Sequence, residues 1–133
     1  MKTFFITISI FLSSSVLAQG DWIEFGTSSS DDPQTQLTLY YNLEFVEKRN
    51  NFLNAVILID FSPPAFDLVG SAKYLNSIDC VDYKRKMLRQ IFYAGPMGEG
   101  ETIEDESLTT ESWEYVLPGS NEHFLLETLC PRF

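Results

Sequence analysis

Residues 52–61 read Phe52-Leu53-Asn54-Ala55-Val56-Ile57-Leu58-Ile59-Asp60-Phe61, which is the strongest strand pattern of the chain. The segment is mostly apolar, as in a strand that contributes to a hydrophobic core. A turn signal, Asn50-Asn51, comes directly before it. Ser62-Pro63-Pro64 comes directly after it, and proline cannot donate a hydrogen bond to a sheet ladder. We therefore expect a strand over residues 52–61 that ends before the two prolines.

Both faces of this strand are apolar. Val56 and Leu58 point to one side, and the opposite side carries Leu53, Ala55, Ile57 and Ile59. A strand that is apolar on both faces is covered on both faces. One short helix would cover part of one side, so the other needs a second layer, a curled sheet or a partner subunit. A homodimer through the open side is one hypothesis that follows.

Weaker strand patterns lie on either side of this segment. We expect strands over residues 21–26, 37–41, 71–80, 83–93 and 113–116, with 71–80 and 83–93 forming a hairpin. Polar residues fill 27–36, and acidic residues dominate 99–111. Both segments are predicted to be loops, the second with weak strand content around Thr102.

A helix is predicted at the end of the chain. Pro118-Gly119 forms a turn, Ser120 is a favourable N-cap, and Glu122 complements the helix dipole in the first turn. Pro131 ends the helix. The predicted apolar face consists of Phe124, Leu125 and Leu129.

The N-terminus is predicted to be a cleavable secretory signal over residues 1–18. Lys2 is followed by an apolar stretch over residues 4–12 and by small residues up to Ala18. The apolar stretch is shorter than the roughly 20 residues that span a membrane. No cysteine lies at the cleavage point to carry a lipid anchor. We expect a single exported domain over residues 19–133.

Composition and charge exclude several classes of protein. The chain is 44% hydrophobic and 14% aromatic, which is far too apolar for a disordered protein. Its net charge is −10, and removal of Lys2 would make the mature chain more acidic still. Such a charge opposes non-specific binding to nucleic acid and to anionic lipid. We therefore expect no nucleic-acid partner.

Cys80 and Cys130 are the only cysteines. In an oxidising compartment, a lone pair of cysteines is most simply a disulfide. The bond would fasten the terminal helix to the strand that ends at Cys80, and would add about 4 kcal/mol of stability. A zinc site is the alternative, but the two cysteines and the single His123 have poor ligand spacing.

No catalytic or cofactor-binding constellation is evident. His123 has no flanking nucleophile signature, and the three glycines Gly95, Gly98 and Gly100 do not match the dinucleotide fingerprint. The acidic run Glu104-Asp105-Glu106 lacks EF-hand spacing. We expect a protein that is not an enzyme and has no cofactor or metal. A secreted hydrolase using His123 or paired acids is the remaining catalytic alternative.

The segment 83–93 combines basic and aromatic residues. It holds half of the basic residues of the mature chain. Strand alternation would place Tyr83, Arg85, Arg89 and Tyr93 on one face, and arginine among tyrosines is frequent in protein-binding surfaces. These four residues are the candidate binding surface. The alternative is that the basic residues neutralise acidic residues on a neighbouring strand.

The order of these features resembles the surface-adhesin E family of small exported bacterial proteins. The matching features are Asp21-Trp22, Tyr40-Tyr41-Asn42, Ile78-Asp79-Cys80, the basic strand with Tyr83, Arg85 and Tyr93, the turn at Gly98 and Gly100, Trp113, Pro118-Gly119-Ser120 and Leu129-Cys130. The resemblance implies an α+β fold, with an antiparallel sheet of about six strands and a C-terminal helix tethered by the disulfide. It also suggests dimers.

The same resemblance implies the function. The family takes its name from a surface adhesin that binds host matrix and serum proteins. We therefore expect an exported, non-enzymatic module that binds another protein, located in the periplasm, on the outer surface or in the medium. The alternative is a periplasmic structural or small-ligand-binding protein.

Overall fold

The computed structural model describes residues 21–109 and 111–133. The predicted signal peptide, residues 1–18, lies outside the described residues. The elements follow one another as β1 (Ile23–Asp31), β2 (Gln34–Tyr41), η1 (Leu43–Phe45), β3 (Glu47–Arg49), β4 (Phe52–Ala65), β5 (Val69–Asp79), β6 (Lys84–Tyr93), η2 (Pro96–Gly98), β7 (Thr102–Ser107), β8 (Glu114–Tyr115), α1 (Asn121–Leu129) and η3 (Cys130–Arg132).

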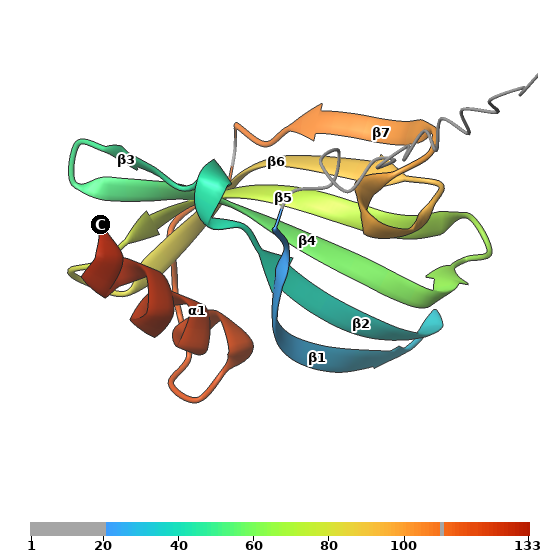
Figure 1. The fold of residues 1–133 in the computed structure, drawn as a ribbon, viewed down its shortest axis with the longest axis horizontal. Helices are drawn as coiled ribbons and strands as arrows, with labels where there is room; N and C mark the ends of the chain where they lie inside the picture. Colours follow the sequence, from blue (N-terminus) through green and yellow to red (C-terminus); the bar gives the residue numbers. More distant parts are fainter. Residues whose placement is uncertain (1–20, 110) are drawn as a thin grey trace, which may run out of the picture.

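A single antiparallel sheet forms the body of the molecule (Figure 1). Its strands lie in the order β1-β2-β4-β5-β6-β7, with β3 paired to β4 and β8 paired to β6. Helix α1 packs beside one end of the sheet and is the only α-helix of the described part (Figure 1). The predicted fold class, an antiparallel sheet of about six strands with a C-terminal helix, is confirmed.

The predicted loop over 27–36 was wrong, because β1 and β2 form a hairpin through this segment. The strands pair from Ile23 with Tyr41 to Asp31 with Gln34, and the chain turns at Asp32-Pro33. Most residues of this edge strand are exposed, so its serines do not alternate with apolar residues. A polar edge strand therefore looks like a loop in the sequence.

Strand β4 also continues further than predicted, through Pro63 and Pro64 to Ala65. The pairing of β4 with β5 shifts register between Asp60 and Ala65, so the two prolines lie where no ladder bond to β5 is required. The acidic segment was likewise only partly a loop, because β7 covers Thr102–Ser107 and pairs with β6.

The core lies between α1 and one face of the sheet. Leu125, Leu126 and Leu129 of the helix pack against Leu53, Ala55, Ile57 and Ile78. The Ser120 side chain accepts a hydrogen bond from the His123 amide at 3.1 Å, which confirms the predicted N-cap. Phe124 was wrongly placed on the apolar face, since it is 54% exposed and Leu126 takes the core position.

The disulfide between Cys80 and Cys130 is confirmed. The Cα atoms are 5.7 Å apart, and both residues pack against the core between the sheet and α1. The bond joins the end of β5 to the end of the helix, as the positions of the two cysteines predicted. None of the helices in the described ranges is both long enough and apolar enough to cross a membrane.

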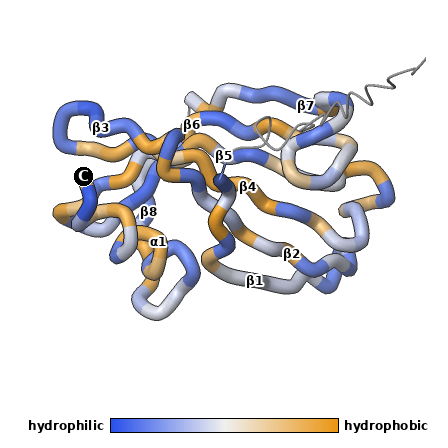
Figure 2. The backbone as a smooth tube through the Cα atoms, viewed as in Figure 1, coloured by the Kyte–Doolittle hydropathy of each residue, from blue (hydrophilic) through white to orange (hydrophobic). Residues whose placement is uncertain are grey.

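The other side of β4 is covered only in part. Leu58 is fully buried there, close to Gly98 of the connection between β6 and β7. This connection is held against the sheet by hydrogen bonds from the Met97 amide to Asp60 and from the Gly98 amide to Ser71. Val56 and Leu75 on the same side remain half-buried. In Figure 2, hydrophobic colouring marks much of β4.

Candidate protein-binding surface

The side of the sheet opposite α1 carries a shallow apolar groove. Two adjoining hollows of about 480 and 130 Å³ share Val56 and Leu75 in their walls. Together they form what we call the open-face groove, lined by Glu44, Phe45, Glu47, Arg49, Asn54, Val56, Lys73, Leu75, Arg89 and Ile91. The floor is aliphatic and the rim carries both signs of charge, a composition suited to contact with another protein.

The predicted surface of Tyr83, Arg85, Arg89 and Tyr93 is divided between the two faces of the sheet. Arg89 pairs with Leu75 of β5, whereas Met87 pairs with the adjacent Asn76. Leu88 is therefore an extra residue, a β-bulge that reverses the alternation of side chains along β6. Arg89 lies on the open face and Arg85 on the helix side. The expectation that they share a face was wrong, because alternation holds only for a strand without a bulge.

Arg89 lines the open-face groove, and Tyr93 lies on the same face of the sheet beside Lys73. The Arg89 guanidinium forms a two-point ion pair with Asp105 of β7, with Nε donating to Oδ1 at 2.7 Å and Nη2 to Oδ2. This hydrogen bonding lowers the pKa of the Asp105 carboxyl and raises the pKa of Arg89. The pair fits the alternative expectation of cross-strand neutralisation, while Arg89 still contributes to the groove wall.

A second cation of the open face is held by aromatic rings. Lys73 Nζ lies 5.3 Å from the ring centre of Tyr93 and 5.8 Å from that of Trp22. Such distances allow a cation–π interaction with each ring. Burial raises the pKa of the Tyr93 hydroxyl, and nearby Asp105 adds to the effect. Tyr93 therefore keeps its proton at neutral pH and offers an uncharged ring to the lysine.

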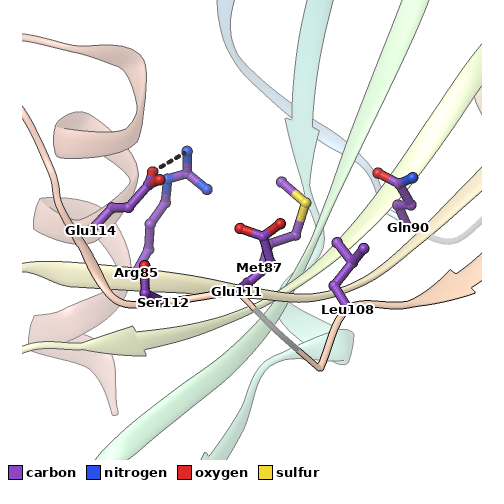
Figure 3. Close-up of a pocket in the computed structure, with 7 residues that line it drawn as sticks. All are labelled: Arg85, Met87, Gln90, Leu108, Glu111, Ser112 and Glu114. Carbon is purple, nitrogen blue, oxygen red and sulfur yellow. Dashed lines mark ion pairs between the residues drawn. The ribbon is translucent and has the colours of Figure 1, made fainter.

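Arg85 and Tyr83 belong to the helix side. Arg85 lies 3.7 Å from Glu114 and, with Met87 and Gln90, lines a hollow of about 350 Å³ beside the segment that leads to β8 (Figure 3). Tyr83 precedes β6 with a positive φ of 50° and packs against the core. The centroids of the Tyr83 and His123 rings are 5.5 Å apart. The four residues that were expected to share a face therefore lie two on each side of the sheet.

Sequence reasoning missed most of the groove. Phe45 lies in a short 3-10 helix, and Lys73 and Leu75 lie on a strand that was predicted without assigning its faces. Val56 was the available signal, because it belongs to the second apolar face of β4. Combining that face with its partners across the sheet would have identified Leu75, which pairs with Val56.

His123 and Glu106 are engaged in local contacts. His123 Nδ1 lies 3.5 Å from Glu127 on the same helix face. Glu106 of β7 accepts a hydrogen bond from Gln90 at 3.1 Å. Among the residues that the structure describes, no three His, Cys, Asp or Glu side chains are arranged to hold a metal ion. The arrangement best suited to recognition is the open-face groove.

The sequence was compared with models of known protein families. The family model described as surface-adhesin protein E matches residues 22–131. The chain belongs to this family. Membership of the surface-adhesin protein E family supports a role as a surface adhesin. The matched region includes every strand and the α-helix described above.

Solved structures agree with this assignment at the level of the fold. Crystal form II of Haemophilus influenzae protein E has 13% identity and a TM-score of 0.56, covering 71% of this chain and 81% of that one. Protein E from non-typeable Haemophilus influenzae has 13% identity and a TM-score of 0.52, covering 70% of this chain and 69% of that one. A search of curated protein sequences found no match.

Proposed function

We propose that this member of the surface-adhesin protein E family is an exported, non-enzymatic adhesin that binds a host matrix or serum protein through its open-face groove. Family membership supports the adhesive role. The predicted signal peptide over residues 1–18 supports export. The proposal requires no cofactor.

The observation that carries the proposal is the partly uncovered apolar floor of the groove. Val56, Leu75 and Ile91 lie on three neighbouring strands, line the same hollow and are only half-buried. The connection with η2 covers Leu58 on the same face but leaves these residues accessible. Contiguous apolar surface with a charged rim is typical of a protein-interaction site.

A matched pair of substitutions tests this site. Leu75→Glu places a charge in the groove, whereas Leu117→Glu makes the same change at an exposed position near α1. Binding of the mature chain to a panel of purified matrix and serum proteins is measured by biolayer interferometry. We expect Leu75→Glu to weaken binding at least about tenfold and Leu117→Glu to leave it unchanged. Equal binding by both variants, or no binding by the wild type, would contradict the proposal.

Phe45→Ser provides a second groove variant in case Leu75→Glu disturbs the fold. Phe45 is exposed and lines the groove from η1, so its removal changes the binding surface with little effect on the core. The same loss of binding is expected.

A second copy of the chain is the other occupant that the groove supports. Its apolar floor and its lining of both charges, with Arg49 and Arg89 as well as Glu44 and Glu47, allow a self-complementary contact. Sedimentation at increasing concentration tests this homodimer. A monomer at high concentration in the wild type would remove it and leave the groove to a different protein.

A periplasmic ligand-binding role is the second candidate function. The larger hollow of the groove, about 480 Å³, falls in the size range of small-molecule sites. A signal peptide crosses only the inner membrane, so retention in the periplasm would favour this role over adhesion.

A further inference from the structure

The turn between β4 and β5 projects beyond the rest of the sheet. The last residue of β4 paired with β2 is Ser62, and the first residue of β5 paired with β6 is Ser71. Within the chain between them, residues 65–69 form what we call the β4–β5 tip. It lies at the end of the sheet far from α1 (Figure 1). The tip is thus free of strand neighbours on either side.

The base of this projection is held firmly. On the β4 side, Thr35 Oγ1 donates a hydrogen bond to the Pro63 carbonyl at 2.6 Å. On the β5 side, Ser71 Oγ donates to the Gly95 carbonyl at 2.7 Å. Gly70 lies so close to the connection between β6 and β7 that a Cβ atom on Gly70 would approach the carbonyl oxygen of Gly95 to 2.6 Å. The tip therefore extends from a fixed base and keeps a defined direction.

The apex has an unusual sequence for its backbone. Phe66 and Asp67 both have positive φ, 54° and 55°, and the Leu68 amide bonds to the Ala65 carbonyl at 3.1 Å. This is the backbone of a tight hairpin turn that strongly prefers Asn-Gly. A phenylalanine at positive φ is strained, whereas the β3–β4 turn, at the opposite end of β4, uses Asn50 at φ 56° as expected.

Packing does not explain the phenylalanine. Phe66 is 72% exposed and Leu68 is 57% exposed, so both aliphatic and aromatic surface face solvent at the apex. Strained residues at exposed positions persist where function requires them. Large apolar residues on a rigid projection resemble the anchor residues that carry most of the energy of a protein interface.

We propose that Phe66 and Leu68 form a preorganised anchor that inserts into an apolar pocket on a partner protein, with a basic group of that protein meeting Asp67. The inference rests on the proposed protein-binding function but assigns it a second contact element. The fixed base lowers the entropy that the tip loses on binding. The tip and the open-face groove would then contact two different parts of the partner.

The chemistry of the apex favours a protein over a lipid surface. Asp67 lies between Phe66 and Leu68, so insertion into a bilayer would carry a carboxylate toward the hydrocarbon. The net charge of −10 also opposes approach to anionic membranes. A protein pocket can instead supply a cation or a hydrogen-bond donor for the carboxylate.

Phe66→Asn is the sharpest test, because asparagine tolerates positive φ and lacks the apolar ring. We expect this variant to melt at the same temperature as the wild type or higher. We expect its binding to the matrix and serum proteins that bind the wild type to weaken at least about tenfold. Val81→Asn is the control, since Val81 is 84% exposed at the β5–β6 turn and should not affect binding.

The outcomes separate this inference from the function on which it rests. Unchanged binding by Phe66→Asn, with binding lost in Leu75→Glu, would overturn the anchor and leave the groove in place. A lower melting temperature for Phe66→Asn would show that the ring serves folding, and would also overturn it. If the wild type binds phosphatidylcholine–phosphatidylglycerol vesicles and Phe66→Asn does not, the anchor inserts into lipid, and the proposed protein pocket is overturned. No binding by the wild type would remove both proposals.

Discussion

At the scale of single residues, the charges of β6 depend on one inserted residue. Leu88 has no partner in the register with β5, and this bulge sends Arg85 and Arg89 to opposite faces. The sequence identified the candidate surface of Tyr83, Arg85, Arg89 and Tyr93. Of these residues, Arg89 lines the groove and Tyr93 lies on the same face beside Lys73. The sequence could not show on which face of the sheet each residue lies, because a β-bulge depends on how two strands fit together and has no short sequence signature here.

Asp105→Asn tests the Arg89–Asp105 ion pair. The pKa of Asp105 is lower in the folded state, so the pair stabilises the fold above the ordinary pKa of aspartate and loses this effect as pH falls through the lowered pKa. We expect the wild type to melt slightly higher than the variant at pH 7, and the difference to vanish in strong acid. Melting curves between pH 7 and pH 2 measure it.

Glu114→Gln serves as the control for this experiment. Its partner Arg85 is 3.7 Å away without a two-point hydrogen bond, so we expect a smaller change of melting temperature at pH 7 than for Asp105→Asn. A melting difference for Asp105→Asn that is the same at every pH would contradict the assignment.

Leu58 and Leu75 allow a matched comparison on the open face. Both are leucines on the side opposite α1, but Leu58 is fully buried and Leu75 is half-buried. We expect Leu58→Ala to lower the free energy of unfolding by about 2–5 kcal/mol. We expect Leu75→Ala to lower it by only about 1 kcal/mol, because less surface is removed from a packed environment. Equal losses in urea unfolding would show that something else covers Leu75.

At the scale of elements, the sequence predicted most strands and the helix but misjudged the polar ones. The β4, β5 and β6 segments and α1 have apolar residues or caps that identify them. β1 beyond Gly26 and β7 are exposed edge strands, so they show no apolar alternation. The loop that covers Leu58 was also not predicted, since its hydrogen bonds to Asp60 and Ser71 join residues far apart in the chain.

The disulfide should contribute measurably to holding α1 on the sheet. Cys80 and Cys130 are 50 residues apart in sequence, so replacing both with alanine should lower the free energy of unfolding by about 4 kcal/mol. Urea unfolding under oxidising conditions measures the loss. Adding a reductant should lower the stability of the wild type to that of the variant and leave the variant unchanged. A wild type that resists the reductant while the variant is equally stable would contradict this role.

At the scale of the whole molecule, one face of the sheet builds the core and the other carries the open-face groove. Helix α1 and the disulfide complete the first face, which leaves the open-face groove and the β4–β5 tip as uncovered apolar surface. The acidic net charge keeps such a molecule soluble and directs it away from nucleic acids and anionic lipids. Both features agree with the role of a family described as a surface adhesin.

Protease treatment of intact cells tests the surface location most directly. A C-terminally tagged chain is expressed in its own bacterium, and the intact cells are treated with protease beside a periplasmic marker protein. We expect protease to remove the tagged chain while the marker remains protected. Protection of the tagged chain, with its release together with the marker by osmotic shock, would contradict the adhesin and place the protein in the periplasm.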